Sequence, residues 1–150
     1  MSPTADTKEA APDVAILNVA LGLELEAIAA YTAGAQSKLL TGAALTMAGS
    51  FLRDHERHRD LLTGWIRRLG GTPVQPKSSY DFGTISSAND IVVLAHTLEQ
   101  GAADAYLANA GNLVNRNLLD DAAGVLVDEV RHATALKLAL SQPVTQRPAY

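Results

Sequence analysis

The sequence of 150 residues contains no cysteine. This absence excludes disulfide bonds, thiolate nucleophiles, cysteine-ligated zinc and iron–sulfur clusters. Any bound metal ion must therefore be held by nitrogen and oxygen atoms. Aromatic residues make up only 5% of the chain, whereas Ala, Leu and Gly are plentiful, and such a composition favours packed helices over a β-sandwich. We therefore expect an all-α protein.

The chain also lacks a basic cluster and a long apolar run. Its formal net charge is −4, and no group of Lys and Arg extends beyond Arg67 and Arg68, which argues against a nucleic-acid partner. No run of about eighteen apolar residues occurs, and the first residues, MSPTADTKEAAPD, do not resemble a secretory leader. We therefore expect a cytoplasmic protein that binds neither nucleic acid nor a membrane.

The length suits one compact domain, and helical periodicity of the apolar residues predicts four helices. These run from Asp13 to about Ser37, from about Gly42 to Leu69, from about Ala88 to Leu113, and from about Asn117 to Leu140. The stretch SSAND is expected to cap the third helix, and Gly70 to end the second. We expect residues 1–12 to be a flexible N-terminus, 13–140 to form the helical domain and 141–150 to be a tail.

Residues 71–87 form a long connection between the second and third helices. They contain two Pro, two Gly and four Ser and show no sustained period. About 17 residues can span the length of a 25-residue helix, whereas the short first and third connections can only reverse the chain direction. The sequence therefore predicts a four-helix bundle with one long crossover between helices two and three.

The two halves of the chain repeat one another. LELEAIAAYTAGA aligns with LEQGAADAYLANA, and DHERHRDLL aligns with DEVRHATAL. The alignment pairs residues with ionisable side chains: Glu24 with Glu99, Tyr31 with Tyr106, Asp54 with Asp128, His55 with Glu129, and His58 with His132. A duplicated helical hairpin would bring these residues together in the middle of the bundle, which indicates a bound cation.

Glu129 and His132 form a Glu-x-x-His motif, whose side chains project about 60° apart on one helical face. Glu24 and Glu99 each add a carboxylate, and carboxylate with imidazole suits iron, manganese or zinc. This pattern resembles the ferritin-like superfamily, whose four-helix bundles hold two metal ions with carboxylates and histidines. The resemblance covers about residues 13–140 and includes the crossover.

The resemblance implies two iron ions per chain, with Mn or Zn as alternatives. Its implied ligands are Glu24, His55, His58, Glu99, Glu129 and His132. It further implies Fe(II) oxidation or other chemistry with oxygen or peroxide, as in a metal-dependent oxidoreductase. Tyr31 and Tyr106, each seven residues after its Glu, are implied as hydrogen-bonding or redox residues beside the metals and are the candidate catalytic pair.

The sequence departs from the family pattern at His55, which stands where the family has a bridging Glu. Three carboxylates leave one positive charge of two divalent ions uncompensated, and an imidazole cannot bridge two metals as a carboxylate does. The alternative interpretation is a ferritin-like scaffold without a working metal site, in which a His–Glu–Arg network fixes the register of the helices or a dimer interface.

Several roles remain open from the sequence alone. Glu24 and Glu99 can instead pair with Arg57 or Arg131 on another helix, and His96 can be an additional ligand or a surface residue. Asp54 and Asp128 are either exposed or orient a histidine of a neighbouring helix, and the two tyrosines can be packed aromatics. Cage-forming ferritins add a fifth helix, so the short tail predicts a monomer or a homodimer.

Overall fold

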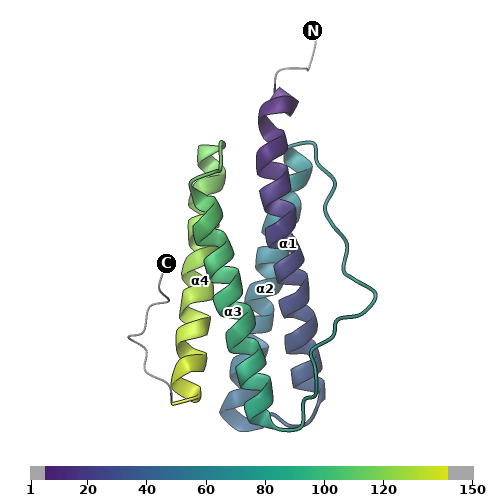
Figure 1. Cartoon of the computed structure of the whole chain (residues 1–150), viewed down its shortest axis with the longest axis vertical. Helices are drawn as coiled ribbons and strands as arrows, with labels where there is room; N and C mark the ends of the chain where they lie inside the picture. The colour runs from purple at the N-terminus through teal and green to yellow at the C-terminus, as the bar shows by residue number, and fades with distance from the viewer. Residues whose placement is uncertain (1–5, 142–150) are drawn as a thin grey trace.

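The computed structural model of the chain describes residues 6–141, which form four helices and no strand (Figure 1). The helices are α1 (Asp6–Gln36), α2 (Gly42–Arg68), α3 (Ala88–Ala110) and α4 (Arg116–Ala139). Short connections join α1 to α2 and α3 to α4, while the long crossover runs beside α1 from one end of the bundle to the other (Figure 1). The predicted all-α bundle with one crossover is confirmed.

The helix ends follow from local chemistry. Ser87 precedes α3, and its side chain accepts the backbone N–H of Asp90, whose carboxylate accepts the N–H of Ser87, as the stretch SSAND predicts. The Asn115 side chain caps α4 by accepting the backbone N–H groups of Asn117 and Leu118. Beyond the end of α2, Gly70 adopts a φ of 78°, which favours glycine.

The start of α1 differs from the prediction. The helix begins at Asp6 rather than Asp13, with Pro12 inside it, so residues 6–12 of the predicted flexible N-terminus are helical. Asp13 is buried, and its carboxylate accepts the backbone N–H groups of Val114 and Asn115, which ties α1 to the α3–α4 connection. The Asp13 carboxylate therefore binds the α3–α4 connection and does not cap the start of a helix. Residues 1–5 and 142–150 of the predicted termini lie outside the described residues.

The core consists of two apolar clusters at opposite ends of the bundle. One cluster contains Leu17, Leu21, Leu62, Trp65, Ile66, Leu118 and Val125. The other contains Ala27, Tyr31, Leu40, Ala48, Ile91, Ala95 and Leu136. Along α1 and α3, Glu24 and Glu99 lie between residues of the two clusters, so the buried polar residues are enclosed by apolar layers on both sides.

Helix α1 is unusually apolar. Its stretch from Ala10 to Gln36 is long enough to cross a membrane, with a mean hydropathy of 1.6 over its best window. A core helix of a bundle meets the same criterion, and α1 packs against both α2 and α3 with Leu17 and Leu21 almost fully buried. The apolar character of α1 therefore matches its position in the core.

Candidate metal centre

The six predicted ligands come together in the middle of the bundle. They come from all four helices: Glu24 from α1, His55 and His58 from α2, Glu99 from α3, and Glu129 and His132 from α4. Each is buried, with at most 5% of its surface exposed. Ionisable side chains are rarely buried unless they are paired or bind a cation, so this clustering needs a chemical explanation.

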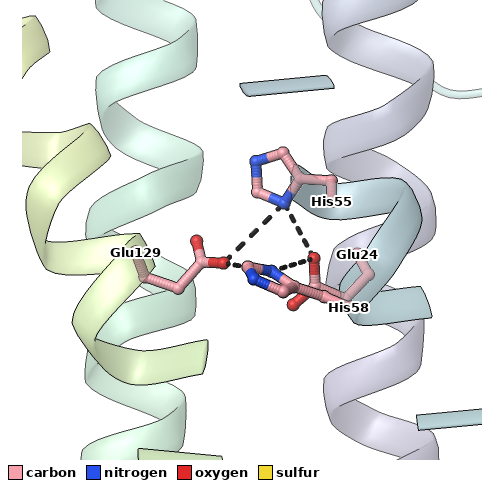
Figure 2. Close-up of side chains that lie close together, drawn as sticks. All are labelled: Glu24, His55, His58 and Glu129. Carbon is pink, nitrogen blue, oxygen red and sulfur yellow. Dashed lines mark hydrogen bonds and ion pairs between the residues drawn. The ribbon is translucent and has the colours of Figure 1, made fainter. Parts of the chain in front are cut away.

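The ligand atoms form two overlapping groups, and within each group they lie within 4.8 Å of one another. The first group is Glu24, His55, His58 and Glu129, and the second is His55, Glu99, Glu129 and His132. His55 and Glu129 belong to both groups, so they occupy the position between two candidate cation sites. Figure 2 shows the first group, with Glu24 and Glu129 approaching the two histidines of α2 from opposite sides.

His55 lies at the centre of the cluster. Its Nδ1 is 2.7 Å from Oε2 of Glu24, and its Nε2 is 3.1 Å from Oε1 of Glu99. The same Nδ1 lies 3.8 Å from Glu129, and the imidazole stacks on the ring of Tyr31. Both ring nitrogens therefore face carboxylates, and His55 lies among the three buried glutamates.

His58 turns one ring nitrogen inward and the other outward. Its Nδ1 lies 3.0 Å from Oε1 of Glu129 and 3.4 Å from Oε2 of Glu24 (Figure 2). Its Nε2 lies 3.4 Å from Oδ2 of Asp128 on α4. A carboxylate that accepts the Nε2 proton holds the imidazole in the tautomer whose Nδ1 lone pair is free for a metal ion.

His132 repeats this arrangement from the opposite helix. Its Nδ1 lies 3.2 Å from Oε2 of Glu99, and its Nε2 lies 3.0 Å from Oδ2 of Asp54 on α2. The ring also stacks on Phe51 at a centroid distance of 3.9 Å. Sequence reasoning missed the contact with Phe51, since the sequence around this residue carries no signal for it. Asp54 and Asp128 therefore orient histidines of neighbouring helices, which was one of the two roles open from the sequence.

The arginines next to the site pair with these aspartates and not with the buried glutamates. Arg57 forms an ion pair with Asp54, and Nη1 of Arg131 lies 3.0 Å from Oδ1 of Asp128. Both arginines are largely exposed. The alternative in which Glu24 and Glu99 pair with these arginines is therefore wrong.

The two tyrosines contact the glutamates crosswise. The hydroxyl of Tyr106 on α3 donates to Oε1 of Glu24 on α1 at 2.9 Å, and the hydroxyl of Tyr31 on α1 donates to Glu99 on α3. Burial and the neighbouring carboxylate raise the pKa of both phenols well above the ordinary value. Both hydroxyls therefore keep their protons at neutral pH and act as hydrogen-bond donors.

Burial and charge compete at the histidines and carboxylates. Burial alone lowers the pKa of His55 and His58, but their contacts with the glutamates raise both values to about 10. Burial and the other glutamates raise the pKa of Glu129 to about 8. Burial also opposes ionisation of Glu24 and Glu99, yet their histidine partners hold the pKa of each below the ordinary value. Without metal, imidazolium ions therefore compensate Glu24 and Glu99, whereas Glu129 keeps its proton at neutral pH.

Glu129 lacks hydrogen-bond partners. Both of its carboxylate oxygens and Nδ1 of His58 are buried and make no hydrogen bond. The 3.0 Å approach of His58 to Glu129 lacks the alignment of a hydrogen bond, so we regard it as an electrostatic contact only. Buried polar atoms without partners are costly, and these donor atoms are of the type that binds iron, manganese or zinc. The residues present therefore fit a metal centre.

His96 and Glu56 do not join the cluster. His96 is half buried on α3, and its burial lowers the pKa of its imidazole. Glu56 is half exposed on α2. Neither belongs to a metal-capable group among the described residues, so the possible role of His96 as an additional ligand is not supported.

The chain resembles known proteins in both sequence and fold. A family model described as a ferritin-like domain matches residues 12–142. A conserved hypothetical protein, rv2844, from Mycobacterium tuberculosis superposes with a TM-score of 0.78 at 22% identity, over 92% of this chain and 99% of that chain. A ferritin-like, diiron-carboxylate protein from Bacillus anthracis str. Ames superposes with a TM-score of 0.74 at 24% identity, over 93% of this chain and 99% of that chain. No curated protein matches the chain.

Proposed function

Because the chain belongs to the family of ferritin-like domains, we propose that its buried centre binds a pair of iron ions and serves Fe(II) oxidation or another reaction with oxygen or peroxide. The observation that carries the proposal is the buried carboxylate of Glu129, whose oxygens have no hydrogen-bond partner. A cation between the two ligand groups would compensate this carboxylate, and Mn²⁺ or Zn²⁺ suits the same donor set.

The two groups divide the ligands between two ions. Glu24 and His58 would hold one ion, Glu99 and His132 would hold the other, and Glu129 and His55 lie between them. Bound iron would supply the electron transfer of a metal-dependent oxidoreductase.

The surrounding residues prepare the ligands for this role. Tyr31 and Tyr106 donate hydrogen bonds to Glu99 and Glu24, which restricts the orientation of these carboxylates. The apolar clusters at both ends of the bundle exclude water, which strengthens electrostatic interactions at the centre.

The position of His55 favours a second candidate function. Its nitrogens lie within hydrogen-bonding distance of Glu24 and Glu99, so a protonated imidazole compensates both carboxylates without a metal ion. In this case the cluster fixes the register of the four helices and performs no catalysis.

Anaerobic titration with Fe(II) distinguishes the two candidates. We expect wild-type protein without a histidine tag to bind Fe(II) tightly, and Glu129→Gln to lose most of this binding because it removes the shared charge. Glu56→Gln is the matched control, since it removes a half-exposed carboxylate on α2 outside the cluster. Equal binding by Glu129→Gln and Glu56→Gln would contradict the shared role of Glu129. No binding by any of the three proteins would support the metal-free scaffold.

A further inference from the structure

A groove of about 650 Å³ lies between the crossover and the hairpin of α1 and α2. The crossover forms its outer wall through residues 73–80, at the place where this segment bows away from α1 (Figure 1). Its floor comes from the apolar side chains of Leu25, Ile28 and Ala29 on α1. None of its lining residues is a ligand or an ion-pair partner in the metal centre, so the groove is a separate site.

The outer wall is tied to α1 at one end. The side chain of Asn18 donates to the carbonyl of Thr72 at 3.1 Å and accepts the backbone N–H of Val74 at 2.8 Å. Further along, the backbone N–H of Lys77 donates to the hydroxyl of Tyr80 at 3.2 Å, and the Lys77 ammonium lies 5.5 Å from the centre of that ring. The start of the wall is therefore fixed to α1, and the segment beyond it is braced by contacts within the crossover.

The rim of the groove is positively charged. Arg59, Arg67 and Lys77 line it together with a single acidic residue, Asp60, which leaves two positive charges in excess on a chain of net charge −4. Arg59 is paired with Asp60 at 2.8 Å. Arg67 is exposed, and its side chain makes no ion pair or hydrogen bond with any residue of the described range 6–141. A positively charged rim beside an apolar floor matches a ligand with an anionic head and an apolar body.

We propose that this groove binds an organic carboxylate with an apolar body. The carboxylate pairs with Arg67 and Lys77, because a guanidinium presents parallel N–H groups to two carboxylate oxygens. The apolar body lies on Ile28 and Ala29, as in small-molecule sites where apolar walls supply contact and a few polar groups fix the orientation.

The test is calorimetric titration of the full chain with decanoate below its micelle concentration. We expect saturable binding by the wild type, and at least about tenfold weaker binding when Arg67→Gln and Lys77→Gln are combined, a difference of about 1.4 kcal/mol. Arg68→Gln is the matched control, since Arg68 is the exposed neighbour whose guanidinium lies 4.4 Å from the centre of the Trp65 ring and outside the groove. This control is expected to bind decanoate as the wild type does.

Decanol and the variant Thr63→Trp complete the test. Decanol has the same apolar body without the charge, so it should bind at least about tenfold more weakly than decanoate. Thr63 lines the groove from α2, and a Trp there should block decanoate without changing the number of iron ions bound, which shows that the bundle is folded. No saturable binding of decanoate to the wild type, equal affinities for decanoate and decanol, or equal affinities of the double variant and Arg68→Gln would overturn the proposal.

Discussion

Nε2 of His132 on α4 lies 3.0 Å from Oδ2 of Asp54 on α2, and this hydrogen bond turns Nδ1 of the same ring toward Glu99. The equivalent contact joins His58 on α2 to Asp128 on α4. The two aspartates therefore connect the helices that carry the histidines and fix the ring nitrogens that face the centre.

Removal of one of these aspartates should weaken metal binding without unfolding the protein. We expect Asp54→Ala to lower Fe(II) affinity by about 10- to 100-fold, because the His132 ring loses the partner that fixes its tautomer and orientation. Asp104→Ala, which removes an exposed carboxylate of α3, is the control in the same anaerobic titration. Equal affinities of the two variants would show that Asp54 does not support the site.

Replacement of His55 by Glu should destabilise the metal-free protein and increase the stabilisation that bound metal provides. A fourth carboxylate balances the charge of two divalent ions, whereas in the metal-free protein it removes the imidazolium between Glu24 and Glu99. We expect His55→Glu to lower the melting temperature of the metal-free protein and to increase the rise in melting temperature on metal binding. Melting curves with metal and with chelator measure both effects, and His96→Gln is the control. An unchanged rise would contradict the bridging position of His55.

The stability of the metal-free protein should fall as the pH rises above neutrality. The pKa values of His55 and His58 are about 10 in the folded protein and about 6.5 in the unfolded chain, so the folded state holds more protons between these values. Glu129, with a folded pKa of about 8, acts in the same direction. The stabilisation is complete below the unfolded histidine pKa and is lost as the pH rises through about 10.

Urea unfolding followed by Trp65 fluorescence measures this effect at about pH 7 and about pH 9.5 in the presence of chelator. The free energy of unfolding should be lower at the higher pH, and His55→Gln should reduce the difference. A stability that is constant or increases over this range would contradict the protonated state of the two histidines.

Loss of the Asp13 carboxylate should destabilise the bundle far from the metal centre. Asp13→Ala removes the buried carboxylate that accepts the backbone N–H groups of Val114 and Asn115, and we expect a loss of about 1–3 kcal/mol in the free energy of unfolding. Asp60→Ala removes an exposed carboxylate and should cost less. Similar free energies of unfolding for the two variants would exclude a structural role for Asp13.

The fold could be predicted from the sequence because its signals are local. The capping pattern at Ser87, the glycine after α2 and the composition of residues 71–87 each specify an element without reference to the rest of the chain. The start of α1 could not be predicted in this way. Asp13 has the chemistry of an N-cap, but its acceptors are used by the connection at Val114, a contact about one hundred residues away in the chain.

The candidate site could be predicted because both halves carry matching residues at helical spacing. The repeat located all six residues of the two metal-capable groups and left open the role of Asp54, whose partner lies on another helix. The contact between the rings of Phe51 and His132 could not be predicted, since packing across helices depends on their relative rotation. The predictions of a cytoplasmic location and of a homodimer stay predictions, as do the internal duplication and the domain limits.

The most direct test of the central claim is the iron content of the wild-type chain. Protein without a histidine tag is loaded with Fe(II) in the absence of oxygen, desalted and analysed for iron per chain, and its absorption spectrum is then followed on exposure to air. The account predicts about two iron ions per chain and an absorption band of oxidised, paired iron that develops in air. One iron ion or none after loading would contradict a paired centre that shares Glu129 and His55.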